Sequence, residues 1–173
     1  MAKNRGKEFE QKVKTQFVNT VGGGTIDRLY DVQGGRAGVR NICDFIAYSY
    51  PFILYIECKS KKGNTYPLSD LLKVNYRVKG APTQYSMLCE KIGLRGVIAG
   101  VLIWFRDHDK VVWVDIRGIK ERLELGLKSV NIKEIGNYYT YELYSTTPRI
   151  YPLINFKSLL KIYKEAENGY KEW

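Results

Sequence analysis

Apolar positions near the start of the chain recur at the spacing of a helix. Phe9, Val13 and Phe17 are four residues apart, and the residues between them are mostly charged or polar. This pattern is typical of a helix that buries one face and exposes the other. We predict that the helix begins at Asn4 and ends before the three consecutive glycines at positions 22–24, because glycine favours turns.

Two strongly apolar runs, rich in β-branched and aromatic residues, follow at Ile42–Tyr48 and Phe52–Lys59. Runs of this length and composition are typical of strands. The Tyr50-Pro51 region between them can supply a turn, so we predict that the two runs pair as a hairpin.

Three charged residues interrupt this predicted hairpin. Asp44 lies within the first run and Glu57 and Lys59 lie in the second. Because alternate side chains of a strand share a face, Glu57 and Lys59 point the same way and Cys58 points oppositely. Two facing carboxylates can hold Mg²⁺ through oxygen ligands, and a neighbouring amine can orient water or stabilise charge on phosphate. The pattern favours a metal-dependent phosphodiesterase over the alternative, which is a set of charges on a solvated strand face, since buried charges are costly without partners.

The remaining apolar patterns predict further helices and strands. We expect a helix from about Thr83 to Ile92, strands at Val97–Phe105 and Val111–Ile116, a short helix at Arg117–Lys128, an extended segment at Tyr138–Tyr144, and a final helix at Phe156–Glu167 capped by Asn155. The chain shows no internal repeat or low-complexity linker. We therefore predict an α/β fold, with one domain over residues 1–173 and a mixed central β-sheet flanked by helices.

The net charge of the chain suggests what kind of partner it binds. The chain has 28 Lys and Arg residues against 18 Asp and Glu residues, which gives a formal net charge of +10. An excess of positive charge favours binding to a polyanion. The alternative is a soluble basic protein without such a partner. The basic residues gather on either side of the predicted hairpin, at Arg28, Arg36, Arg40, Lys59, Lys61 and Lys62. This distribution favours nucleic acid.

Other features exclude several classes of protein. Cys43, Cys58 and Cys89 form no C-x-x-C pair, which argues against a disulfide framework or a zinc site. The single histidine, His108, lies in a predicted turn far in sequence from the acids, which argues against chemistry that needs a histidine base. No apolar run is long enough to span a membrane and no signal peptide is evident, so we expect a cytoplasmic protein with no membrane partner.

Several short segments, taken in order, resemble a known family. They are Asn4–Glu10, Cys43–Ile46, Tyr55–Lys61, Tyr66–Leu68, Gln84 at the start of a helix, and Thr147–Tyr151. Together they resemble the RecU-type Holliday junction resolvases, a branch of the PD-(D/E)xK nuclease superfamily. The resemblance extends from Asn4 to Tyr151 and implies a restriction-endonuclease-like domain.

The resemblance also implies roles for particular residues. Asp44 and Glu57 would hold Mg²⁺, with Mn²⁺ as a substitute, helped by the backbone carbonyl of Cys58 and by Glu10 from the first helix. Lys59 would position water and stabilise charge on the phosphate. Gln84 would orient the water, because an amide can both donate and accept a hydrogen bond. For Glu10 the alternative is a solvated helix residue, with Glu8 as a rival, and for Gln84 it is a local hydrogen bond.

The expected partners are DNA four-way junctions and a second copy of the chain. The residues that would contact DNA are Asn4, Arg5, Arg36, Arg40, Lys61 and Lys62. Resolving a four-way junction needs two cuts in opposed strands, which suggests a two-fold homodimer.

The sequence also departs from the family in one respect that bears on its substrate. RecU-type enzymes carry a long stalk insertion before the catalytic acid, whereas only the glycine-rich and basic segment Gly22–Cys43 fills that interval here. Junction resolution is therefore our leading interpretation. A restriction-type or end-processing nuclease that cuts duplex DNA is the second, and a DNA-binding protein with a vestigial nuclease site is the third.

Overall fold

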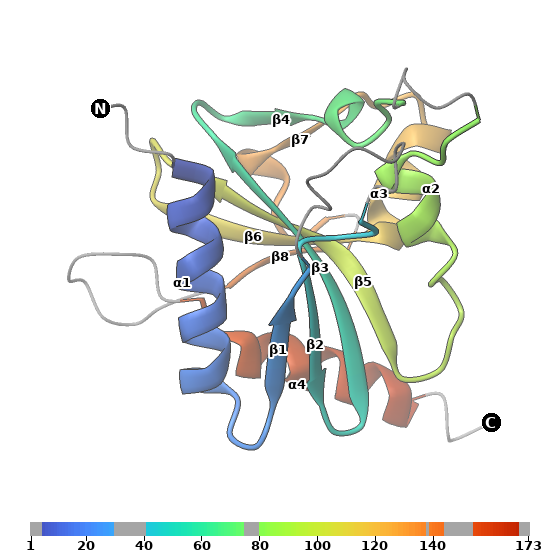
Figure 1. Ribbon diagram of the computed structural model, residues 1–173. Coiled ribbons are helices and arrows are strands. Elements are labelled where there is room, and N and C mark those ends of the chain that lie inside the picture. Colours follow the sequence, from blue (N-terminus) through green and yellow to red (C-terminus); the bar gives the residue numbers. More distant parts are fainter. Residues whose placement is uncertain (1–4, 30–40, 75–79, 138, 144–153, 170–173) are drawn as a thin grey trace.

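The protein is built on a mixed β-sheet with helices on both faces (Figure 1). The computed structural model describes residues 5–29, 41–74, 80–137, 139–143 and 154–169. In this part of the chain the six-stranded sheet has the order β1-β2-β3-β5-β6-β8. Its strands are β1 (Thr25–Arg28), β2 (Phe45–Ser49), β3 (Phe52–Lys61), β5 (Val97–Phe105), β6 (Lys110–Asp115) and β8 (Thr140–Glu142). The predicted α/β fold with a mixed central sheet is confirmed.

The hairpin predicted from the two apolar runs is present as β2 and β3. These strands pair antiparallel with Phe45 opposite Ile56, and the turn between them contains a cis peptide bond at Tyr50-Pro51. On its other side β3 pairs in parallel with β5, which in turn pairs antiparallel with β6. Every residue of β5 after Val97 is buried, so this strand lies at the centre of the core.

One face of the sheet is covered by α1 (Arg5–Thr20) and α4 (Phe156–Gly169). The predicted apolar stripe of α1 is confirmed, since Phe9, Val13 and Phe17 are all buried. The ring of Phe17 meets that of Phe156 on α4 at a centroid distance of 5.1 Å. Phe9 stacks on Trp104 of β5 at 5.6 Å. These contacts hold both helices against the same face.

The opposite face is covered by α2 (Gln84–Cys89), α3 (Ile116–Glu124) and a small two-stranded sheet of β4 (Thr65–Pro67) and β7 (Ser129–Asn131). Two short 3₁₀ helices, η1 (Leu68–Asp70) and η2 (Ile132–Glu134), complete this layer. No helix in the described part of the chain is long and apolar enough to cross a membrane.

Several predicted boundaries were wrong for local reasons. Ile116 begins α3 instead of ending a strand, because the Asp115 side chain accepts a hydrogen bond from the Arg117 backbone N–H at 2.7 Å and so caps the helix. The α2 and α3 helices end at Cys89 and Glu124, earlier than expected. The strand β1 and the β4–β7 pair were not predicted at all.

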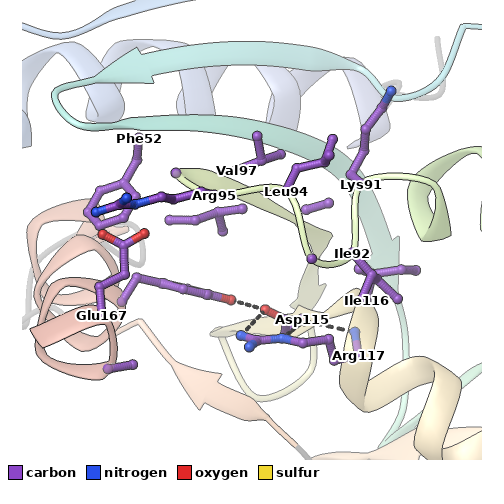
Figure 2. Close-up of a pocket in the computed structure, with 16 residues that line it drawn as sticks. Phe52, Lys91, Ile92, Leu94, Arg95, Val97, Asp115, Ile116, Arg117 and Glu167 are labelled. Carbon is purple, nitrogen blue, oxygen red and sulfur yellow. Dashed lines mark hydrogen bonds and ion pairs between the residues drawn. The ribbon is translucent and has the colours of Figure 1, made fainter. Parts of the chain in front are cut away.

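A buried hydrogen-bond network joins α4 to the sheet. The indole N–H of Trp113 donates to the Tyr163 hydroxyl at 3.1 Å, and that hydroxyl donates to the Asp115 carboxylate. Arg117 donates to both oxygens of Asp115, at 2.9 Å each, and Figure 2 shows these two residues joined beside a pocket. Asp115 is only 2% exposed, and the guanidinium of Arg117 balances its charge. The network therefore fixes α4 relative to β6 and α3.

We expect Tyr163→Phe to lower the free energy of unfolding by about 1–3 kcal/mol, because the indole N–H of Trp113 and one Asp115 oxygen would lose a buried partner. Chemical denaturation measures this change. Tyr48→Phe, at a position that is 45% exposed, is the matched control and should change stability by less than about 0.5 kcal/mol. Equal effects of the two substitutions would contradict a stabilising network.

Candidate active site

Asp44 occupies a backbone position that three strands hold in place. It directly precedes β2 instead of lying within the strand as predicted. Its backbone N–H still donates to the carbonyl of Ile56 on β3 at 3.1 Å, and its carbonyl accepts from Leu29, just after β1, at 2.8 Å. The carboxylate accepts the backbone N–H of Cys58 at 2.7 Å. Asp44 is therefore held against the middle of β3 by both its backbone and its side chain.

Glu57 and Lys59 share one face of β3, as the strand alternation predicts. The Lys59 amine donates to Glu57 Oε1 at 2.5 Å and to the Gln84 side-chain oxygen at 3.4 Å. Glu57 is 2% exposed, whereas the Lys59 side chain is 24% exposed and reaches the surface. Cys58 packs on the other face, against the core under α1, as predicted.

Gln84 reaches this cluster from α2. It is the first residue of the helix, and the Thr83 side chain caps the helix by accepting the backbone N–H of Ser86 at 3.0 Å. Gln84 is 5% exposed, and its side-chain oxygen points toward the Lys59 amine. The structure thus brings together four of the five predicted catalytic side chains, namely Asp44, Glu57, Lys59 and Gln84.

Opposing influences act on the pKa of Asp44 in this cluster. Burial raises the pKa of Asp44 above its usual range, while the Cys58 N–H, the charge of Lys59, a hydrogen bond with Glu57 and the charge of Arg28 all act to lower it. The carboxyl groups of Asp44 and Glu57 are therefore neighbours in a partly desolvated site. A charged carboxylate pair in such a place needs positive charge nearby.

The groups that face a cation here are hard oxygen donors. Burial, reinforced by the charge of Glu57, raises the pKa of the Cys43 thiol to about 12, so this sulfur stays protonated near neutral pH. Burial also raises the pKa of Cys58 well above its usual range. The carboxylates of Asp44 and Glu57 fit Mg²⁺ or Mn²⁺, and the carbonyl of Cys58 stays a predicted third ligand.

No group of three or more His, Cys, Asp or Glu side chains among the described residues has the arrangement of a metal site.

The side chain of Glu10 lies between α1 and β1. It forms an ion pair with Arg28 of β1 and lines a pocket between α1 and β1. Its charge still acts on Cys58, so it lies near the cluster, and its role as a metal ligand stays a prediction. The rival Glu8 pairs instead with Arg5 at 2.9 Å and with Lys12 at 3.4 Å, on the helix surface.

The other predicted residues lie in different parts of the chain. Asn4, Arg36, Arg40 and the segment Thr147–Tyr151 lie outside the described residues. Lys61 ends β3 and Lys62 follows it at the surface. His108 is exposed in its turn and contacts Asn64.

Sequence reasoning missed the position of Arg28. The residue pairs with Phe45 in the β1–β2 ladder, one position from Asp44. Burial raises the pKa of the Asp44 carboxyl, and the charge of Arg28 is one of the influences that partly offset this rise. The segment Thr25–Arg28 has a single apolar residue, Ile26, so its sequence carries only a weak strand signal.

Comparison with known proteins shows the fold. Neither protein-family models nor curated proteins give a match. Among solved structures, the chain is similar to the 1.6 Å structure of Hjc from Archaeoglobus fulgidus, a Holliday junction resolvase from an archaeal hyperthermophile. The TM-score is 0.50 and the identity 17%, over 79% of this chain and 95% of that chain. The protein therefore has a restriction-endonuclease-like fold of the kind seen in Hjc.

We expect Asp44→Asn to raise the free energy of unfolding of the metal-free protein at pH 7, by about 1 kcal/mol or more. The reason is that burial disfavours the charged carboxylate, whereas an amide oxygen can still accept the Cys58 N–H. Chemical denaturation in the presence of a chelator measures the effect. Asp27→Asn removes the same charge from an exposed position on β1 and should leave stability nearly unchanged. A loss of stability in Asp44→Asn would contradict this electrostatic account.

Proposed function

We propose that the protein is a metal-dependent, structure-selective DNA endonuclease that resolves Holliday junctions, and that it belongs to the RecU type within the PD-(D/E)xK superfamily. The observation that carries the proposal is the meeting of the Asp44 and Glu57 carboxyl groups beside Lys59 and Gln84, at one end of the β2–β3 pair. Two acids and a lysine arranged in this way suit hydrolysis of a phosphodiester.

Each side chain has a role that its geometry supports. Asp44 and Glu57 would hold Mg²⁺, or Mn²⁺ in its place, with the Cys58 carbonyl as a further ligand. When bound, such a cation lowers the pKa of water and neutralises charge on phosphate. Lys59, anchored by Glu57 and partly exposed, can donate to a phosphate oxygen and stabilise the charge that develops there. The Gln84 oxygen faces Lys59, and its amide group can both donate and accept, which suits orientation of a water.

The reaction that follows from these roles is hydrolysis with the 3′ oxygen as leaving group. A water oxygen forms a bond to phosphorus as the bond from phosphorus to the 3′ oxygen breaks. The products are a 5′ phosphate and a 3′ hydroxyl. Lys59 and Gln84 hold the phosphate and the water in line, so these two side chains act by positioning and by electrostatics.

The charge of the chain supports DNA as the partner. A net charge of +10 favours binding to a polyanion. Arg5 begins α1, and Lys61 and Lys62 lie at and just after the end of β3, the strand that carries Glu57 and Lys59. Because a four-way junction needs two opposed cuts, a two-fold homodimer is part of this proposal.

One observation favours a second candidate, a nuclease for linear duplex DNA. Only residues 29–44 separate β1 from β2, which is the interval where RecU-type enzymes insert their stalk. A chain whose stalk is reduced or absent would lack part or all of the element that enters the centre of a junction. Substrate preference therefore decides between the two nuclease functions.

Cleavage of a four-way junction and of a linear duplex with the same sequence, each with Mg²⁺ or a chelator, tests the proposal. We expect Mg²⁺-dependent cuts, faster in the junction, and none in Glu57→Gln, which removes the charge of a carboxylate that is 2% exposed. Equal cleavage of both DNAs would favour the duplex nuclease. Junction binding without cleavage in the presence of Mg²⁺ would favour the DNA-binding protein with a vestigial site.

Lys59→Ala should lower the turnover number by about 10²-fold or more, because it removes a positioned cation, and should change the affinity for DNA much less. Single-turnover cleavage and anisotropy binding measure the two quantities separately. Lys161→Ala, on the exposed surface of α4, removes the same charge and serves as the control. A loss confined to affinity would assign Lys59 to phosphate binding alone.

A further inference from the structure

A cavity of about 180 Å³ lies at the end of the sheet far from the candidate active site. Its walls are the loop between α2 and β5, the start of α3 and the C-terminal half of α4, with Phe52 at one side (Figure 2). Since a strand rises about 3.3 Å per residue, the run of β3 from Phe52 to Lys59 separates the two places by roughly 20 Å. The cavity is therefore distinct from the candidate active site.

One wall of the cavity carries a guanidinium whose orientation is fixed. The Nε and one terminal nitrogen of Arg117 each donate to the Asp115 carboxylate at 2.9 Å. Asp115 is 2% exposed and also accepts from the Tyr163 hydroxyl. The Arg117 side chain is nevertheless 43% exposed. Because a guanidinium has five N–H donors, the two bonds to Asp115 leave Arg117 able to donate to a bound anion.

The residue that stacks on Arg117 has an unusual backbone conformation. The ring centroid of Tyr139 lies 4.8 Å from the Arg117 guanidinium. Tyr139 has a φ of 53°, in the left-handed region that residues other than glycine rarely adopt. Its carbonyl accepts the Asp115 backbone N–H at 3.1 Å, which ties this conformation to the start of α3. Strained residues of this kind cluster at ligand-binding positions, so the strain directs attention to Arg117.

The loop on the other side of the cavity supplies a second guanidinium. Arg95 and Leu94 are both exposed there, just before Gly96, which has a φ of 71°. A Cβ at Gly96 would lie only 2.9 Å from the Pro51 carbonyl oxygen, so glycine lets this loop approach the β2–β3 turn closely. Figure 2 shows Arg95 on the loop side of the cavity and Arg117 on the opposite side.

The lining combines apolar surface with an excess of positive charge. Its apolar residues are Ile92, Val97, Ile98, Ala99, Ile116 and Ala166. Lys91, Arg95 and Arg117 contribute three cations against the acids Asp115 and Glu167. Asp115 is already paired with Arg117, which leaves two cations and one acid. The Lys91 amine is directed away from the cavity, over the ring of Tyr55 at 5.3 Å, so Arg95 and Arg117 are the cations placed to contact a ligand (Figure 2).

We propose that this cavity binds a small organic anion, with one ring or a short aliphatic chain against the apolar lining and a carboxylate or phosphate group contacted by Arg95 and Arg117. A cavity of about 150 Å³ can hold a benzene ring, so the available space suits a body of this size. Guanidinium groups bind both kinds of anionic group through paired N–H donors. The proposal goes beyond the nuclease function and does not depend on it, because neither a metal nor DNA takes part.

Nuclear magnetic resonance of isotope-labelled protein, without metal or DNA, tests the proposal. Phenyl phosphate and phenylacetate carry a ring and an anionic group, benzyl alcohol carries only the ring, and inorganic phosphate and acetate carry only the anion. The Trp113 indole N–H donates to the Tyr163 hydroxyl beside the cavity, so its signal reports on the site. The Trp104 indole N–H, which donates to Asp109 near the other end of β5, is the internal control.

At least one of the two ring-bearing anions should shift the Trp113 signal to saturation and leave the Trp104 signal in place. It should bind about tenfold or more tightly than the probes that carry only the ring or only the anion, because both parts of the cavity then contribute. Tighter binding of phenyl phosphate would assign a phosphate ester, and tighter binding of phenylacetate a carboxylate. No saturable shift with either, or equal binding of all probes, would overturn the proposal.

Substitutions around the cavity should change the affinity in opposite directions. Arg95→Gln removes an exposed cation and should weaken binding about tenfold, whereas Glu167→Gln removes the remaining acid and should strengthen it. Ala166→Leu should also weaken binding, because it fills part of the cavity without changing the charge. Lys120→Gln, on the exposed side of α3, is the matched control and should bind as the wild type does. Equal affinities of Arg95→Gln and Lys120→Gln would contradict the assignment.

The same signals distinguish a small anion from DNA as the ligand. A four-way junction is added in a chelator to protein that holds the bound probe. We expect the side-chain amide signal of Gln84 to change and the Trp113 signal to keep its probe-bound position. Displacement of the probe by the junction would overturn the proposal and assign the cavity to the DNA backbone. Cleavage with Mg²⁺ is assayed separately, so a protein that binds the anion without cutting DNA, or cuts DNA without binding the anion, shows which of the two proposals fails.

Discussion

The site depends on two acidic side chains that the fold holds together where the β2–β3 pair ends, although they repel each other when charged. Asp44 has little freedom, because its backbone bonds to Ile56 and Leu29 and its carboxylate to the Cys58 N–H. Glu57 is buried on the neighbouring strand. Burial raises the pKa of Asp44, and the nearby positive groups act against this shift. This arrangement lowers the stability of the metal-free protein but suits the binding of a cation. Preorganised sites usually show this relation between stability and function.

The polar residues around the candidate site lie on both faces of the sheet. Lys59 and Gln84 lie on the face covered by α2, where a phosphate and a water would be oriented. Arg28 and several polar residues of α1 lie on the other face. Asp44 lies at the edge between them, within reach of the charges on both sides. The network of Trp113, Tyr163 and Asp115 lies away from this edge and holds α4 against the sheet.

Much of the fold was predictable because the strongest patterns are local. The spacing of Phe9, Val13 and Phe17 predicts α1, and the alternation around Glu57 and Lys59 predicts which side chains share a face. The strands that were not predicted have weak local sequence patterns. The strand β1 has four residues beside three glycines, and β4 and β7 are strands of three residues that are stabilised by pairing with each other. The position of Arg28 beside Asp44 depends on strand register between distant residues, which no local spacing reveals.

The central claim is that Asp44 and Glu57 together bind a divalent cation. Titration of Mn²⁺ into the protein, followed by electron paramagnetic resonance of the free ion, measures this without reference to cleavage. The account predicts that Asp44→Asn and Glu57→Gln each weaken Mn²⁺ binding by at least about tenfold, while Asp27→Asn, on the exposed side of β1, binds as the wild type does. Unchanged Mn²⁺ affinity in both site variants would contradict it.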